Sequence, residues 1–156
     1  MKKKILGIIL VLMLSVTCMG GRSIVSNAEE VGEDIELSYL LTDSALVGYA
    51  DMQTWGVYYS DGYSIINKIS STKIGAGGVT NANIKCKVSV TSVVERQTAT
   101  GWAFVTAWTQ TNENAFSAVV SKSLTVGTGY WYRVRSTHYA ATDVSSSNTS
   151  ALWMGN

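Results

Sequence analysis

The feature that most constrains this chain is a series of short segments, from Tyr58 onward, in which apolar and polar residues alternate. The clearest segment is Ile84–Val90, Ile-Lys-Cys-Lys-Val-Ser-Val, whose period of two is typical of a strand with one buried face. Its expected inward side comprises Ile84, Cys86, Val88 and Val90. Turn signals such as Ser60-Asp61-Gly62 separate neighbouring segments, because Asp-Gly accepts the backbone angles of tight turns.

The remaining segments complete an all-β pattern. Strands are expected at Tyr63–Ile69, Lys73–Asn81, Trp102–Thr109, Phe116–Val126, Gly129–Ala140 and around Leu152, with a turn at Gln97–Gly101 and loops at Thr111–Asn114 and Thr142–Ser150. Sustained helical periodicity is found nowhere in the sequence. About seven short strands separated by turns predict an antiparallel sandwich of the immunoglobulin or fibronectin type III kind over residues 58–156.

The N-terminus has the pattern of a secretory signal peptide. Met1–Lys4 is basic, and the apolar run Ile5–Val16 is too short to span a bilayer, which takes about twenty residues. Ser26-Asn27-Ala28 offers small residues for cleavage after Ala28, so residues 1–28 are expected to be removed as a signal helix. The alternative is a lipoprotein acylated at Cys18, although Ser15-Val16-Thr17 is a poor lipobox.

Charge divides the expected mature chain into an acidic leader and a basic body. Residues 29–61 hold eight acidic residues and no Lys or Arg, whereas residues 62–156 hold eight basic and three acidic residues. The leader, residues 29–57, is expected to be partly ordered. The leader is either a solvated acidic tail or a segment that lies on the basic side of the body. In the second case, salt would weaken the attraction between the opposite charges of leader and body. Cys86 would be the one cysteine after cleavage, so no internal disulfide is expected.

The stretch Gly129–Ala140, Gly-Tyr-Trp-Tyr-Arg-Val-Arg-Ser-Thr-His-Tyr-Ala, concentrates aromatic and basic residues. Alternation in a strand puts Tyr130 and Val134 on one face and Arg133 and Arg135 on the other. Burying an unpaired guanidinium costs several kcal/mol, so the arginine face should point outward and the Tyr130 face inward.

The residues just before this stretch resemble the connection between strands E and F of fibronectin type III domains. Leu124 precedes Tyr130 by six residues, and Val134 follows in the pattern Tyr-x-x-x-Val. This resemblance implies a tyrosine corner, in which the Tyr130 hydroxyl bonds back to the connection, with Leu124 and Val134 packed nearby. It also implies that Phe116–Val126 is strand E and that Ala151–Met154 is strand G.

A wider set of motifs resembles one family of small secreted proteins. The motifs are Tyr58–Ile66, Val94-Glu-Arg96, Trp102, Trp108 and Tyr132–His138, in this order. The family comes from Gram-positive, clostridia-like bacteria and is catalogued only as a domain of unknown function. The resemblance implies an exported single-domain protein and transfers no activity.

Residues for catalysis or metal binding do not form a recognisable pattern. A Ser-His-Asp triad would have to use His138, with Asp143 as its nearest acid, but the sequence has no Gly-x-Ser-x-Gly elbow. His138 is instead expected near a sheet edge, and Cys86 as a small apolar side chain. One histidine and one cysteine cannot make a structural zinc site. We therefore expect no enzyme activity, cofactor or metal.

The best binding candidate is the outward face of the Gly129–Ala140 strand with its expected neighbour. The candidate residues are Trp131, Arg133, Arg135, Tyr139, Lys85 and Lys87. Such a face could stack on a sugar ring or hold an anionic cell-wall polymer. The alternative is a purely structural cross-strand ladder, in which arginine stems cover Trp131 and one arginine pairs with Glu95.

The sequence thus predicts a secreted, monomeric β-sandwich protein that acts as a non-enzymatic extracellular binding module. A secreted toxin or bacteriocin-like protein is the alternative from another class. Nucleic acid is not expected as a partner, because the chain is exported and its mature part is acidic overall.

Overall fold

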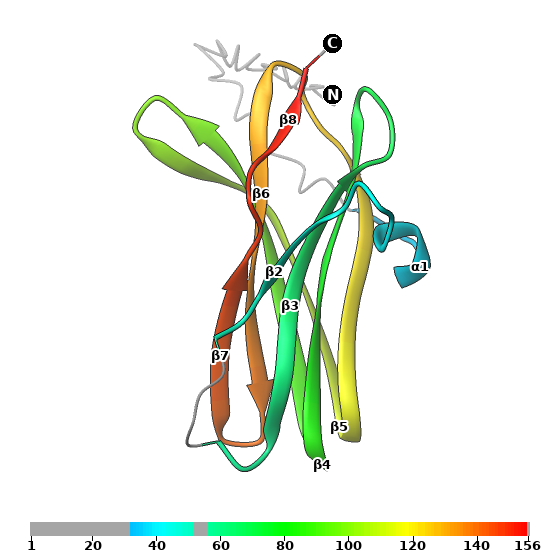
Figure 1. Cartoon of the computed structure of the whole chain (residues 1–156), viewed down its shortest axis with the longest axis vertical. Helices are drawn as coiled ribbons and strands as arrows, with labels where there is room; N and C mark the ends of the chain where they lie inside the picture. The colour runs from blue at the N-terminus through cyan, green and yellow to red at the C-terminus, as the bar shows by residue number, and fades with distance from the viewer. Residues whose placement is uncertain (1–31, 52–55, 156) are drawn as a thin grey trace, which may run out of the picture.

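The computed structural model describes residues 32–51 and 56–155, and this part of the chain is an antiparallel all-β fold with one short helix (Figure 1). Its elements are β1 (Glu33–Asp34), α1 (Leu37–Leu40), β2 (Leu46–Tyr49), β3 (Tyr59–Lys68), β4 (Lys73–Thr98), β5 (Gly101–Thr125), β6 (Tyr130–Ala140), β7 (Asp143–Asn148) and β8 (Leu152–Met154). The predicted all-β, antiparallel fold class is confirmed. The predicted signal helix, its cleavage site and Cys18 lie outside the described residues.

Two long strands build both layers of the sandwich. Residues 73–81 of β4 pair with β3 and with the end of β5, whereas residues 88–96 of the same strand pair with β6 and with the start of β5. Figure 1 shows β4 and β5 running side by side along the long axis of the molecule. One layer therefore contains β2 and β3 and the other contains β6, β7 and β8, yet hydrogen bonds connect all of them through β4.

The register of β4 changes where the strand passes between the layers. Shifts fall on both sides of Cys86, and Ile84 just before it is 48% exposed. The expectation that Ile84 faces inward is therefore wrong. The irregular pairing interrupts the alternation of inward and outward side chains, which begins again at Val88 and Val90, both fully buried. Cys86 is partly exposed and packs against the core from its margin.

Three segments that locally favour turns or loops are strands in the structure. Ser60-Asp61-Gly62 lies within β3, and Thr142–Ser150 contains β7. Thr111–Asn114 lies within β5, where Asn114 adopts a φ of 47° and the pairing with β4 skips residues. The predicted turn and loops at these places are wrong, because pairing with neighbouring strands outweighs local preference and bulges absorb the misfit. The turn at Gln97–Gly101 is confirmed in part, since β4 and β5 join at Thr98 and Gly101.

Apolar side chains fill the space between the layers in two clusters. One cluster comprises Ile66, Ile74, Ala76, Val94, Leu124, Val126, Tyr132, Val134 and Met154. The other comprises Tyr59, Ala82, Val88, Val90, Ala118, Val120 and Ala140. Burial of a large aliphatic or aromatic side chain contributes about 1.5–3 kcal/mol, so these clusters supply most of the stability.

The acidic leader lies on the body of the fold in the described residues. Leu40 of α1 is fully buried, and β2 extends the sheet by pairing with β3. Strand β1 pairs with β5, where Glu33 lies 2.8 Å from Lys73 and Asp34 lies 2.7 Å from Lys122. Exposed ion pairs of this kind contribute at most about 1 kcal/mol each, so Leu40 and the backbone pairing hold the leader more firmly than its charges do.

The alternation predicted for β6 is present, but the tyrosine corner is made by a different residue. Arg133 and Arg135 face outward, and Val134 is fully buried beside Leu124. Tyr130 is 43% exposed, whereas Tyr132 is 2% exposed and donates a hydrogen bond from its hydroxyl to the Gly127 carbonyl, 3.0 Å away. The inward orientation of Tyr130 is therefore wrong: the connection from β5 lies over Tyr132. The wider likeness to fibronectin type III domains stays a prediction.

We expect Tyr132→Phe to lower the free energy of unfolding by about 1 kcal/mol, because the partly buried hydrogen bond to the Gly127 carbonyl is lost while the ring is kept. Tyr130→Phe is the matched control and should change it by less than about 0.5 kcal/mol. Urea unfolding followed by tryptophan fluorescence measures both. A larger loss for Tyr130→Phe than for Tyr132→Phe would contradict this assignment of the corner.

Candidate functional site

The outward faces of the paired strands β6 and β8 carry two exposed tryptophans. The register of β6 and β8 places Trp131 opposite Trp153, and their ring centroids lie 5.2 Å apart with the planes tilted by 47°. Trp131 is 42% exposed and Trp153 is 46% exposed. Tilted aromatic pairs at this distance attract each other, so the two rings form one preorganised apolar surface.

Beside this pair, a single carboxylate serves two arginines. Glu95 of β4 lies opposite Arg133 in the register and accepts a hydrogen bond from its Nε at 2.7 Å. Its other oxygen accepts a hydrogen bond from Nη2 of Arg135 at 3.3 Å. Glu95 is 8% exposed, which makes these pairs stronger than pairs in open solvent. The three groups together keep only one positive charge.

Each arginine at this end of the sheet also lies near an aromatic ring or a carboxylate. The guanidinium of Arg133 lies 4.2 Å from the centre of the Trp102 ring, and that of Arg96 lies 4.5 Å from the centre of the Tyr130 ring. These contacts resemble the cross-strand ladder that the sequence offered as the alternative to a binding site, with two differences: Glu95 pairs with both arginines rather than one, and a different tryptophan is covered. Arg133 covers Trp102 rather than Trp131, and the Trp131–Trp153 pair stays exposed.

The structure brings together only part of the predicted binding face. Trp131 and Arg133 lie near the start of β6 and Arg135 lies at its middle, whereas Tyr139 lies near its end, opposite Ser89 and Val144. Lys87 pairs with Glu113 at 2.8 Å, and Lys85 lies 5.5 Å from the centre of the Phe116 ring. Lys87 is eight residues from Glu95 along β4, a separation of about 26 Å in an extended strand.

Sequence reasoning missed Trp153 and Trp102 as members of this face. The alternation of Leu152, Trp153 and Met154 could have shown that Trp153 points away from the core, since its two neighbours are apolar. Its position opposite Trp131 could not be read from the sequence, because it depends on the register between β6 and β8. The same holds for Trp102, which reaches Arg133 across β4.

His138 lies in the core, so its expected place near a sheet edge is wrong. It is fully buried, and both ring nitrogens share hydrogen bonds of 2.8 Å, Nδ1 with Thr80 Oγ1 and Nε2 with Ser147 Oγ. A chain of buried hydroxyls continues from Ser147 through Ser64 and Ser136 to Ser92, with distances of 2.7, 2.8 and 2.9 Å. These partners explain how a histidine can occupy an inward position of β6.

The structure separates His138 from the acid of the hypothetical triad. The Asp143 carboxylate accepts hydrogen bonds from the backbone N–H groups of Tyr58 and Tyr59, at 2.7 and 2.9 Å, and these bonds hold its pKa below the usual value. Ser147 and His138 do form a hydrogen-bonded pair, but both are buried. Among the described residues, no cluster of three or more His, Cys, Asp or Glu side chains could hold a metal ion.

Helices long and apolar enough to cross a membrane are also not found within residues 32–51 and 56–155.

The sequence from residue 29 to residue 152 matches the model of a family described as "Family of unknown function (DUF6147)". The expected resemblance to a domain of unknown function is therefore confirmed, whereas a Gram-positive origin stays a prediction.

Two further comparisons add little. No curated protein matches the chain. Among solved structures, the solution structure of R. palustris CsgH is similar over 67% of this chain and 90% of its own, with 15% identity and a TM-score of 0.36. Neither fold nor function is argued from a likeness of this extent.

Burial lowers the pKa of His138 from 6.5 to about 4, and Asp61 opposes this shift only in part. The folded state therefore keeps the ring neutral at a pH where the unfolded chain binds a proton. We expect the free energy of unfolding to fall by about 3 kcal/mol as the pH drops from 6.5 to 4, because about 1.4 kcal/mol corresponds to each pKa unit. Urea unfolding at several pH values measures this slope.

The matched control for this slope is His138→Gln. This variant is expected to be less stable at neutral pH, but its stability should be nearly flat between pH 4.5 and 6.5. The lowered pKa values of Asp143 and Glu33 act mainly below that window. A slope that persists unchanged in His138→Gln would show that another group causes it.

Proposed function

Because the chain belongs to the family of unknown function DUF6147, which brings no activity with it, we propose from its own geometry that it is a secreted, non-enzymatic binding module. Its binding surface is the Trp131–Trp153 pair with the adjoining Arg133 and Arg135. Its ligand is a neutral carbohydrate chain, such as a glycan of a cell wall. The signal-peptide pattern of residues 1–28 supports export.

The exposed tryptophan pair carries this proposal. Large apolar rings that stand side by side on a surface remain in contact with water at a cost, and such patches mark interaction sites. Tryptophan, with tyrosine and arginine, is also enriched among the energetically dominant residues of binding surfaces. Two tilted rings 5.2 Å apart offer adjacent flat surfaces on which the C–H faces of pyranose rings can stack.

Charge favours a neutral ligand over an anionic polymer. Both arginines already bond to Glu95, so an incoming anion would have to compete with an intramolecular carboxylate. The lysines that would have extended a basic surface lie elsewhere, one of them paired with Glu113. The arginine N–H groups that do not bond to Glu95 can still donate hydrogen bonds to sugar hydroxyls.

The non-enzymatic part of the proposal is supported by the position of His138. A general base must come within about 3 Å of the proton it removes. His138 is fully buried behind Thr80 and Ser147, so a bound glycan at the outer face would be on the other side of the sheet.

We expect Trp131→Ala and Trp153→Ala each to weaken binding of neutral wall oligosaccharides at least ten-fold, which corresponds to about 1.4 kcal/mol. Isothermal titration with a panel of soluble glycans measures the affinities. Tyr139→Ala, on the same face of β6 but at its other end, should bind as the wild type does. Absence of binding by the wild type to every glycan in the panel would refute the proposal.

The role of Glu95 gives a separate prediction. Glu95→Gln removes the carboxylate that occupies Arg133 and Arg135, so the variant should gain affinity for anionic wall polymers such as teichoic acid. This gain should disappear as salt is raised to about 0.5 M. Strong, salt-sensitive binding of teichoic acid by the wild type would instead show that the natural ligand is anionic.

A further inference from the structure

The tryptophan pair is one end of a longer outward surface that runs across the strands. β8 and β4 pair with opposite edges of β6, and β5 follows β4 in the sheet. Across these four strands lie, in order, Trp153, Trp131, Glu95 and Trp102. Strands are spaced about 4.8 Å apart, so the surface is about 14 Å wide, which is the length of a short oligosaccharide.

Arg133 gives this surface a fixed, cationic hydrogen-bond donor. Its Nε donates to Oε2 of Glu95 at 2.7 Å, and its guanidinium lies 4.2 Å from the centre of the Trp102 ring. The side chain is 26% exposed, and its two Nη groups have no hydrogen-bond partner within residues 32–51 and 56–155. Because two contacts already hold the guanidinium in place, a ligand that bonds to the free N–H groups does not have to order a flexible side chain.

The charges around Arg133 favour an uncharged acceptor. Glu95, Arg133 and Arg135 together keep one positive charge, so a cationic group is repelled. An anion has to compete with the Glu95 carboxylate for both guanidinium groups. An amide carbonyl carries no charge and is a better acceptor than a hydroxyl oxygen. In a glycan this group is the carbonyl of an acetamido substituent, whose methyl group also adds apolar contact with the tryptophan rings.

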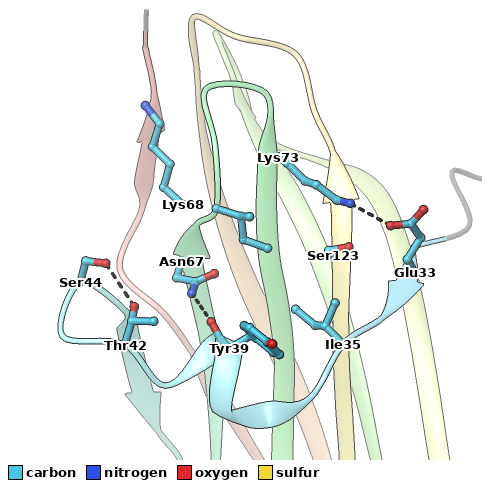
Figure 2. Close-up of a pocket in the computed structure, with 10 residues that line it drawn as sticks. Glu33, Ile35, Tyr39, Thr42, Ser44, Asn67, Lys68, Lys73 and Ser123 are labelled. Carbon is cyan, nitrogen blue, oxygen red and sulfur yellow. Dashed lines mark hydrogen bonds and ion pairs between the residues drawn. The ribbon is translucent and has the colours of Figure 1, made fainter.

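The Asn67 pocket, a cavity of about 430 Å³ between the acidic leader and the body of the fold, offers a different surface (Figure 2). Its lining includes Tyr39, Asn67 and Ile69 but, among the described residues, neither a tryptophan nor an arginine. At its rim, Lys73 lies 2.8 Å from Glu33. The arrangement of stacking rings beside a fixed guanidinium is therefore found on the tryptophan side and not in this pocket.

We propose that Arg133 makes the outward surface selective for acetamido sugars. Its free N–H groups donate to an acetamido carbonyl, while the sugar rings stack on Trp131 and Trp153. This inference rests on the proposed function and names the class of neutral glycan, a chain of N-acetylhexosamine units. The chain crosses the strands from β8 toward β5, so one oligosaccharide contacts the tryptophan pair and Arg133 together.

The test compares three β-1,4-linked tetrasaccharides that differ only in the group at C2 of each sugar. Cellotetraose carries hydroxyl groups, N-acetylchitotetraose carries acetamido groups, and the deacetylated chain carries amino groups, which are cationic in mildly acidic buffer. Isothermal titration of the wild-type protein should give at least ten-fold tighter binding of N-acetylchitotetraose than of cellotetraose, as expected for a hydrogen bond from a charged donor. The deacetylated chain should bind most weakly.

The outcomes separate this selectivity from the proposed function. If cellotetraose or the deacetylated chain binds as tightly as N-acetylchitotetraose, the selectivity is overturned and the proposed function stands. The same holds if N-acetylchitotetraose does not bind but another neutral glycan does. Absence of binding to every glycan overturns both.

Arg133→Met assigns the selectivity to this side chain. The variant loses the donors but keeps an apolar stem beside Trp102, so the preference for N-acetylchitotetraose over cellotetraose should fall to about two-fold or less. The matched control Arg96→Met also removes a guanidinium near an aromatic ring, 4.5 Å from the centre of Tyr130. Arg96 lies opposite the inward-facing Tyr132, on the other side of the sheet from Trp131, so this variant should keep the full preference.

Ile69→Trp, which narrows the Asn67 pocket, is a second control and should also keep the preference. The readout is a ratio of two affinities measured on one protein sample, so a general loss of stability does not imitate the effect. A preference that survives in Arg133→Met, or that is lost in Arg96→Met or Ile69→Trp, would overturn the assignment to Arg133.

Discussion

The two layers of the sandwich depend on strand β4, which is hydrogen-bonded to β3, β5 and β6. Most β-sandwiches join two sheets through side-chain packing alone. Here the backbone of β4, like that of β5, runs through both layers, so the position of residues 73–81 fixes that of residues 88–96. The irregular stretch around Cys86 is therefore the point that aligns the β3 side of the core with the β6 side.

Buried hydroxyl groups refine this alignment. Ser64 of β3, Ser136 of β6, Ser147 of β7 and Ser92 of β4 meet between the layers, and His138 and Thr80 extend their chain of hydrogen bonds. A shift of any one strand by a residue would turn its hydroxyl to the opposite face and leave its partners buried and unpaired, at a cost of about 1–3 kcal/mol each. The polar chain thus favours one register among several that the apolar clusters alone would permit.

The register then decides which outward side chains meet. Trp131 faces Trp153 because β6 and β8 pair as they do, and Glu95 can serve two arginines because β4 lies next to β6. On the leader side, Asn67 is held by the carbonyls of α1, and Gly75 of β4 leaves room for it. The tryptophan pair is thus a consequence of strand pairing, and the position of Asn67 is a consequence of the packing of α1 on β3 and β4, rather than of any local motif.

The sequence by itself determined the all-β class, the alternation of β6 and the outward direction of Arg133 and Arg135, because burial and a period of two follow from the order of residues. Pairing between distant strands decided the rest. It made strands of Ser60-Asp61-Gly62 and Thr142–Ser150, exposed Ile84 and gave the corner hydrogen bond to Tyr132 instead of Tyr130. It also enclosed His138 and assembled the tryptophan pair and the Asn67 pocket. These outcomes depend on which strands pair and in which register, whose free energies no local pattern encodes.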